Sequence, residues 1–220
     1  MREKGSVAVI HSDSVKTHGQ AGGGENFRLQ TEAGAVDARL HKAVGDAAVL
    51  WVFGSGGGLG GPAGGVYERL GRQLCASNVT SLQMDYRFPG NLRKCIKDVL
   101  LGIDYLKSMG KSRIILVGHS FGGAVVISAG ILSDEVAAVA ALSSQTSGTD
   151  DVGQLSPKSL LLVHGTEDEI LPDSCSLYIY ALAKEPKDLI LYSGSKHGLD
   201  QCVEELDRDL KNWIKGAFSL

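Results

Sequence analysis

Short runs of apolar residues alternate along this chain with longer segments whose apolar residues are spaced at helical intervals. The mainly apolar runs are typical of strands covered on both faces, and they occupy residues 47–53, 112–117, 136–142, 159–163 and 188–192. Residues 79–85 contain more polar positions and are predicted to form a further strand between two helices. The longer segments predict helices over residues 66–74, 91–108, 124–130, 173–183 and 201–218. Strands that alternate with helices predict an α/β fold, in which a mainly parallel sheet has helices on both faces.

The N-terminal part has a different pattern. Residues 27–31 and 36–41 alternate apolar with polar positions, which predicts a hairpin with one face in water and places His41 on the surface. The preceding residues are polar and rich in glycine, so we expect residues 1–26 to form a loosely packed arm. Residues 27–220 then form a single domain with enough chain for a sizeable core.

One predicted strand ends in a motif that carries chemistry. The run at 112–117 leads into Gly118-His119-Ser120-Phe121-Gly122, and the small residues of the predicted helix 124–130 follow. Gly-x-Ser-x-Gly between a strand and a helix predicts a sharp elbow that exposes the serine hydroxyl at the edge of the sheet. Because the chain contains 29 glycines, the motif alone could arise by chance, and its interpretation depends on partner residues.

A serine hydroxyl needs a histidine to take its proton and an acid to orient that histidine. Asp168 follows the predicted strand 159–163, and His197 follows the last predicted strand, 188–192. Parallel strands bring their carboxyl ends to one edge of a sheet, so Ser120, Asp168 and His197 are expected to lie together. We expect His197 to be the base and Asp168 to orient it.

Neighbouring residues offer alternatives for these roles. Glu167 and Glu169 flank Asp168, and either could orient the histidine or form a surface ion pair. His119 and His164 compete with His197, but both directly flank strand ends. We interpret His119 as a spacer inside the elbow and His164 as a turn residue.

At these positions the chain resembles the α/β-hydrolase superfamily. Residues 118–123, 164–168 and 194–197 are similar to its nucleophile, acid and histidine motifs, in the order Ser, Asp, His, and the resemblance covers residues 27–218. The polar segment 143–158 is too short for a cap domain. In its small size and its lack of a cap, the predicted domain is similar to dienelactone hydrolases and related small esterases and thioesterases. The resemblance implies cleavage of a carboxylic ester or thioester through an acyl-enzyme on Ser120, without a metal or an organic cofactor.

The resemblance also implies an oxyanion hole made of two backbone N–H groups. Phe121 supplies one of them because it follows the nucleophile. The second is expected from the glycine-rich loop after the strand 47–53, either from Ser55 or, as the alternative, from Gly56. In this loop Phe53-Gly54 stands where the family more commonly has His-Gly.

Several side chains that follow strands are candidate walls of a substrate pocket. They are Tyr86, Phe88, Ser143, Ile170 and Leu171. None of them specifies a particular substrate molecule, and the pocket is expected to be comparatively open because a cap is absent from the predicted elements.

Two other functions fit parts of the sequence. Residues Gly56 to Gly61 match the Gly-x-Gly-x-x-Gly of dinucleotide-binding proteins, with Asp85 at the end of the next strand. In so glycine-rich a segment this match is weak, and it leaves the three later motifs unexplained. A non-catalytic binding protein on a hydrolase fold is the other alternative, and the intact Ser-Asp-His set argues against it.

Charge and cysteine content exclude some classes of partner. The net charge of -3, from 22 basic and 25 acidic residues, gives no electrostatic basis for binding nucleic acid or an anionic membrane. The four cysteines show neither zinc-ligand spacing nor a redox motif. Since no stretch is typical of a signal peptide or a membrane span, we expect a cytoplasmic protein that acts on a small molecule, with its oligomeric state left open.

Overall fold

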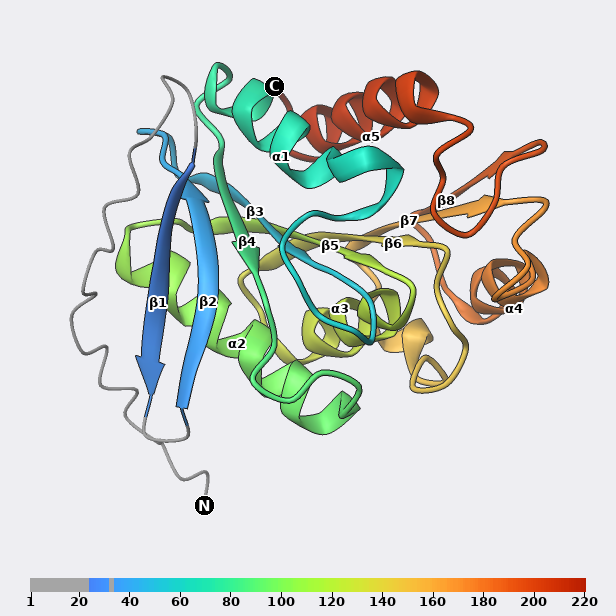
Figure 1. The fold of residues 1–220 in the computed structure, drawn as a ribbon, viewed down its shortest axis with the longest axis horizontal. Coiled ribbons are helices and arrows are strands. Elements are labelled where there is room, and N and C mark those ends of the chain that lie inside the picture. The colour runs from blue at the N-terminus through green and yellow to red at the C-terminus, as the bar shows by residue number, and fades with distance from the viewer. Residues whose placement is uncertain (1–23, 32–33) are drawn as a thin grey trace.

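A computed structural model describes residues 24–31 and 34–220, and in them an open sheet lies between two layers of helices (Figure 1). Within these residues eight strands follow the order β1-β2-β4-β3-β5-β6-β7-β8. The strands are β1 (Glu25–Thr31), β2 (Gly34–His41), β3 (Ala47–Val52), β4 (Thr80–Met84), β5 (Arg113–His119), β6 (Val136–Leu142), β7 (Ser159–Gly165) and β8 (Lys187–Tyr192). The helices are α1 (Pro62–Cys75), α2 (Leu92–Ser108), α3 (Phe121–Leu132), α4 (Ser174–Leu182) and α5 (Val203–Ala217), with a short 3-10 helix η1 (Val152–Gln154).

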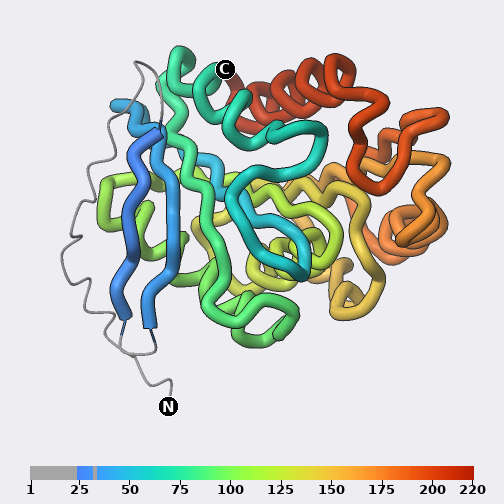
Figure 2. Tube along the Cα trace, in the orientation of Figure 1, coloured from blue at the N-terminus to red at the C-terminus, as the bar shows by residue number. Residues whose placement is uncertain are grey.

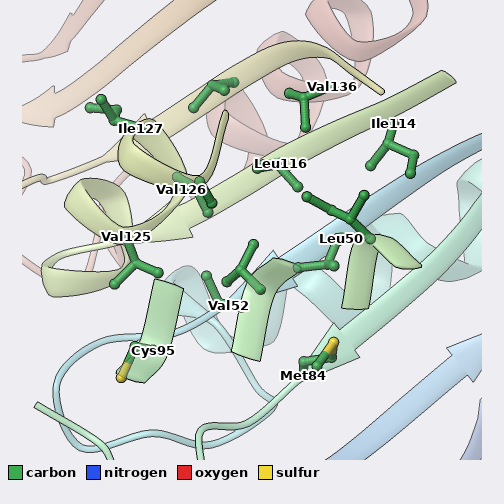
Figure 3. Close-up of a cluster of buried hydrophobic side chains, with 14 of the residues drawn as sticks. Leu50, Val52, Met84, Cys95, Ile114, Leu116, Val125, Val126, Ile127 and Val136 are labelled. Carbon is green, nitrogen blue, oxygen red and sulfur yellow. The ribbon is translucent and has the colours of Figure 1, made fainter. Parts of the chain in front are cut away.

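The alternation of side chains along β3 divides the core in two. Leu50 and Val52 point into one apolar cluster, and Val49 and Trp51 point into the other. Every residue of β3 is buried, which explains why the strand is a continuous apolar run in the sequence. Figure 3 shows part of the first cluster, where Leu50 and Val52 lie near side chains of α2 and α3.

Each cluster is closed by its own layer of helices. Helices α2, α3 and α4 cover one face of the sheet, and α1 and α5 cover the other (Figure 1). The pairs from β4 to β8 in the sheet order are parallel, whereas β1 and β2 run antiparallel at one edge. The predicted α/β fold class is therefore confirmed.

The predicted elements are present, with shifts at their ends. The first turn of α1 has left-handed backbone angles at residues 63–65, so regular helix starts at Val66, where the apolar spacing predicts it. The predicted arm, residues 1–26, lies almost wholly outside the described residues, and β1 already begins at Glu25. All four cysteines are free thiols. No helix in the described ranges has the length and apolar character needed to cross a membrane.

The prediction that His41 lies on the surface is wrong. Its side chain is buried, and Nε2 lies 3.1 Å from Oε2 of Glu68 in α1. The reason is that β2 is paired on both sides, with β1 and β4, and that α1 packs over its end, with Gly71 close to the imidazole ring. An alternating strand can therefore still bury a polar residue when a helix supplies its partner.

Glu68 is the centre of a polar cluster that fastens α1 to the sheet. Its carboxylate accepts hydrogen bonds from Arg39, His41, Gln83 and Arg72 at 2.9 to 3.2 Å. Burial alone would raise the pKa of Glu68, but the donors on His41, Arg72 and Arg39 lower it to about 2. The carboxylate is therefore charged in the folded protein at all but strongly acidic pH.

We predict that Glu68→Gln lowers the free energy of unfolding at pH 7 by about 2 kcal/mol, because charged hydrogen bonds are lost, among them those to the buried His41 and the half-buried Arg39. A carboxylate whose pKa is depressed on folding stabilises the protein above its ordinary value of 4.5, and this stabilisation is lost as the pH falls towards 2. Urea unfolding should therefore show a smaller difference in stability between the wild-type protein and Glu68→Gln at pH 3 than at pH 7. Glu204→Gln, at an exposed position in α5, is the control, with an expected change below about 0.5 kcal/mol. Equal losses in the two variants would contradict the prediction.

Candidate active site

The loops after β3, β5, β7 and β8 meet at the carboxyl edge of the sheet. Figure 2 shows the loop after β3, in cyan, beside the end of β5, in green, and Gly54 in that loop packs against Ser120. The loop after β8 is joined to both segments: the Ala63 N–H donates to the Gly198 carbonyl at 2.7 Å, and the His119 ring bonds the His197 carbonyl at 2.8 Å. These contacts bring the predicted site residues into one region.

Ser120 occupies a sharp turn between β5 and α3. Its φ of 58° and ψ of −123° are a strained conformation for a residue that has a Cβ atom. The Ser120 N–H donates to the Leu142 carbonyl at 2.8 Å, which ties the turn to β6. Gly122 permits the turn because a Cβ atom at this position would collide with the carbonyl oxygen of Phe53. The predicted strand, elbow and helix are thus all present around the serine.

The structure brings Asp168 and His197 into contact. Nδ1 of His197 lies 2.7 Å from Oδ2 of Asp168, whose side chain is fully buried. Because a carboxylate can only accept, Nδ1 carries the proton of the neutral imidazole and Nε2 is left as a free base. Across the described residues no hydrogen bond joins Ser120 Oγ to His197. Contacts between a nucleophile and its base often tighten only when substrate binds.

The Asp168 carboxylate accepts four hydrogen bonds. Oδ1 accepts from the backbone N–H groups of Ile170 and Leu171, each at 2.8 Å, and Oδ2 accepts from His197 and from His164, the latter at 3.1 Å. Burial raises the pKa of Asp168, but the hydrogen bonds from Leu171, His197 and Ile170 outweigh it and hold the pKa below its ordinary value. The carboxylate therefore stays charged.

The neighbouring acids have a different environment. Glu167 and Glu169 are both exposed, and Glu169 lies 4.0 Å from the ammonium of Lys196. Of the three adjacent acids, Asp168 is the one whose carboxylate contacts His197. The geometry favours Asp168 over both alternatives.

His119 does more than separate Gly118 from Ser120. Its ring packs between Phe53 and His197, with centroid distances of 5.3 Å and 4.8 Å. Nε2 must carry the proton because its partner, the His197 carbonyl, only accepts, while Nδ1 is buried without a partner among the described residues. Burial lowers the pKa of His119 to about 4, so this ring is neutral at neutral pH. His119 therefore ties the elbow to the loop of His197.

The segments that were predicted to form an oxyanion hole both border Ser120. A Cβ atom on Gly54 would lie 3.6 Å from Ser120 Cβ, so the loop after β3 approaches Ser120 closely. The Gly57 N–H donates to the Gly54 carbonyl at 3.0 Å, and this turn leaves Ser55 and Gly56 exposed at its corner. Phe121 is the first residue of α3, so its N–H has no acceptor within the helix.

The glycine-rich loop packs onto Asp85. Oδ1 of this residue accepts from the backbone N–H groups of Gly58 and Tyr86 at 2.8 Å and 2.7 Å, and a Cβ atom at Gly57, where φ is 72°, would collide with the same oxygen. In dinucleotide-binding proteins the corresponding acid binds a ribose. Here Asp85 holds the loop, so the glycines have a structural explanation that involves no nucleotide.

Sequence reasoning missed the contacts that fix the loop of His197. The bond from Ala63 to Gly198 depends on the left-handed backbone of Ala63, Gly64 and Gly65, whose φ values are 52°, 59° and 94°. The dense glycines around Pro62 were the available signal for an unusual backbone here. No feature of the sequence indicates which carbonyl such a turn would reach.

No protein-family model matches the chain. The uncharacterized protein YfhR of Escherichia coli strain K12 is 31% identical over an alignment of 118 residues, and the match covers 43% of this chain and 42% of YfhR. The chain thus spans less than half the length of this curated relative.

Solved structures cover most of the chain. The α/β hydrolase GrgF from Penicillium sp. has a TM-score of 0.74 at 15% identity, over 90% of this chain and 99% of GrgF. The dienelactone hydrolase from Anabaena variabilis also has a TM-score of 0.74, at 13% identity, over 88% of this chain and 98% of that enzyme. This chain has the α/β-hydrolase fold. In the described residues the fold carries no cap domain, because the segment 143–158 between β6 and β7 contains only η1.

The predicted pocket residues of this hydrolase fold have different environments. Tyr86 is buried, and its hydroxyl donates to the Phe53 carbonyl at 3.1 Å. Phe88 is exposed, with the Lys94 ammonium 3.7 Å from its ring centroid. Ser143 is buried at a positive φ of 45°, and its Oγ has no partner in the described part of the chain.

The loop after β7 supplies the other two predicted pocket residues. Ile170 has a side chain that is 65% exposed, whereas Leu171 is half-buried and bonds Asp168 and His164 through its backbone. A hollow of about 290 Å³, which the sequence did not indicate, lies between the loop after β6 and α4. It is lined by Thr146, Ser147, Gly148, Asp150 and Tyr178.

We predict that Gly122→Ala destabilises the protein by about 2 to 3 kcal/mol, because the new Cβ atom must push the end of β3 away from the elbow. Gly216→Ala in α5 is a matched control, since no atom lies within 4 Å of its new Cβ, and it should gain up to about 1 kcal/mol from higher helix propensity. Thermal and urea unfolding measure both changes. An unchanged stability in Gly122→Ala would show that the elbow tolerates a side chain and that the close approach is not essential.

Proposed function

We propose that this chain is a hydrolase that cleaves a carboxylic ester or a thioester through an acyl-enzyme on Ser120. The observation that carries the proposal is the strained elbow at Ser120 on the same sheet edge as the hydrogen-bonded Asp168–His197 pair. The fold shared with solved hydrolases supports it. One of these neighbours is named as a dienelactone hydrolase, and a lactone is a cyclic ester.

The first half of the proposed reaction forms the acyl-enzyme. His197 Nε2 takes the proton of Ser120 Oγ while the oxygen attacks the carbonyl carbon, which gives a tetrahedral intermediate with a negatively charged oxygen. The intermediate collapses, His197 returns the proton to the leaving alcohol or thiol, and the acyl group stays on Ser120. Asp168 stabilises the imidazolium that forms in between.

The second half releases the acid. His197 takes a proton from a water molecule, whose oxygen attacks the acyl carbon, and the second tetrahedral intermediate breaks its bond to Ser120. His197 then returns the proton to the serine oxygen, which restores the starting state. Because the same base serves both halves, His197 must keep Nε2 free at the start of each half.

The oxyanion of each intermediate needs preorganised donors. We assign the backbone N–H of Phe121 and that of Ser55, with Gly56 as the alternative to Ser55. Each such donor contributes about 3 kcal/mol to the stabilisation of the transition state in comparable enzymes. The close packing of Gly54 on Ser120 supports the assignment, because no side chain separates this loop from the nucleophile.

We further assign the walls of the substrate pocket to side chains around the uncapped edge. They are Tyr86, Phe88, Ser143, Ile170 and Leu171. The proposed partner is a small molecule that binds between these loops. A screen of p-nitrophenyl esters and of acyl thioesters with increasing acyl length would define the preferred substrate within this class.

We predict that a fluorophosphonate probe labels the wild-type protein and that Ser120→Ala abolishes both labelling and ester hydrolysis. Loss of the nucleophile should reduce hydrolysis by at least about 10³-fold. Mass spectrometry of the labelled peptide and release of p-nitrophenol measure the two effects. Ser147→Ala, at an exposed position in the loop after β6, controls for the loss of a hydroxyl. A folded wild-type protein that neither reacts nor hydrolyses any ester would favour the non-catalytic binding protein.

We predict that kcat/KM falls on acidification as a histidine base takes up its proton, which for an ordinary histidine occurs near pH 6.5. The hydrogen bonds that hold the pKa of Asp168 below its ordinary value keep the carboxylate charged there, so this acid does not cause the loss. Rates measured from pH 4 to pH 9 on one ester give the profile. Activity that stays level down to about pH 4 would contradict a histidine base.

A further inference from the structure

A second histidine reaches the carboxylate of Asp168. His164 Nε2 lies 3.1 Å from Oδ2 of Asp168, the same oxygen that lies 2.7 Å from Nδ1 of His197. The side chains of His164 and Asp168 are both fully buried. The two histidines therefore converge on one oxygen atom whose side chain is shielded from solvent.

The tautomer of His164 follows from its partners. Nε2 also lies 2.9 Å from the carbonyl oxygen of Leu171, which can only accept, so Nε2 carries the proton. Nδ1 is then the acceptor, and the hydroxyl of Ser176, buried on α4, donates to it at 2.7 Å. A continuous chain of donors thus runs from Ser176 through His164 to Asp168.

We propose that His164, oriented by Ser176, is a positioning residue that holds the Asp168 carboxylate and sets how strongly it attracts the proton of His197. The inference rests on the proposed function of the Ser120 site. It adds a fourth residue to Ser120, Asp168 and His197. Because His164 is fully buried and does not reach substrate, it acts only through Asp168.

The geometry of the carboxylate supports this role. Oδ1 is fixed by two backbone N–H groups of its own loop, so the orientation of Oδ2 depends on His164 and His197. Without His164, the oxygen would keep one donor and an unsatisfied lone pair in a buried site. Removing a residue that orients a functional side chain through a hydrogen bond typically lowers rates by about 10- to 100-fold.

The same contact has a consequence for the pH profile. The N–H of His164 withdraws part of the negative charge of Oδ2, which would otherwise stabilise the protonated form of His197. Removing this donor should strengthen the attraction between Asp168 and the imidazolium. The acid limb of the profile should then move to higher pH.

Other titratable groups surround this pair and are common to all variants below. From the elbow, His119 stacks on His197 and is neutral because burial lowers its pKa to about 4. From α4, Cys175 has a thiol whose pKa is raised by burial, so it is neutral as well. The loop residues Lys196 and Glu169 form an exposed pair at 4.0 Å.

The test compares three variants of the full chain. His164→Leu removes both ring nitrogens, His164→Gln places an amide N–H near the position of Nε2, and Ser176→Ala removes the donor to Nδ1. We expect His164→Leu to lower kcat/KM by about 10- to 100-fold and to move the acid limb to higher pH. His164→Gln should restore most of the loss, and Ser176→Ala should shift the limb in the same direction by a smaller amount.

A spectroscopic signal provides a readout that does not depend on turnover. The proton shared by His197 Nδ1 and Asp168 Oδ2 should give a downfield proton resonance, and it should change in His164→Leu and return towards the wild-type position in His164→Gln. An unchanged resonance and acid limb in all three variants would overturn the proposal, as would equal losses in the Leu and Gln variants. If His164→Leu does not fold, Ser176→Ala and His164→Gln decide the outcome by the same two readouts.

Failure of this inference is distinguishable from failure of the proposed function. If the wild-type protein does not react with a fluorophosphonate, the assignment of Ser120 as nucleophile is at fault. If the wild-type protein reacts and hydrolyses esters while the His164 variants behave like it, only the positioning role is refuted.

Discussion

The Asp168 carboxylate is a negative charge buried at the edge of the sheet, and the arrangement of the site depends on how that charge is satisfied. An unpaired buried charge would cost many kcal/mol, so the fold must bring donors to it from several segments. They come from its own loop, from His164 at the end of β7 and from His197 after β8. Satisfying one carboxylate therefore fixes the relative positions of two strand ends and, through Ser176, of helix α4.

The backbone makes a second set of connections across the same edge. The carbonyl of His197 is held by His119 from β5, and that of Gly198 is held by Ala63 in the first turn of α1. A strained residue such as Ser120 persists only where its surroundings determine its conformation from several sides. The hydrogen bond to β6 and the close approach of Gly122 to β3 provide that support.

The histidines show how one side-chain type acquires different roles. His197 has one nitrogen on a carboxylate and, among the residues that the structure describes, no hydrogen-bond partner on the other, which is the arrangement a general base requires. His119 is neutral and bonds a backbone carbonyl, whereas His164 is saturated by a hydroxyl, a carbonyl and a carboxylate. His41 lies at the other end of the sheet, where it joins Glu68 in fastening α1. Their surroundings, rather than their chemistry, distinguish the proposed base from the other histidines.

The sequence by itself determined the order of strands and helices, because a strand covered on both faces must be apolar at every position, as β3 is. It also determined that Ser120, Asp168 and His197 share one edge, since each follows a parallel strand. Only the tertiary structure decided that His41 is buried, that Asp85 holds the glycine loop, that His119 bonds the His197 carbonyl and that His164 contacts Asp168. The physical reason is that periodicity specifies the face to which a side chain points, whereas a hydrogen bond depends on which atoms come within about 3 Å. His119 and the carbonyl it binds are 78 residues apart, and no local pattern encodes such a meeting.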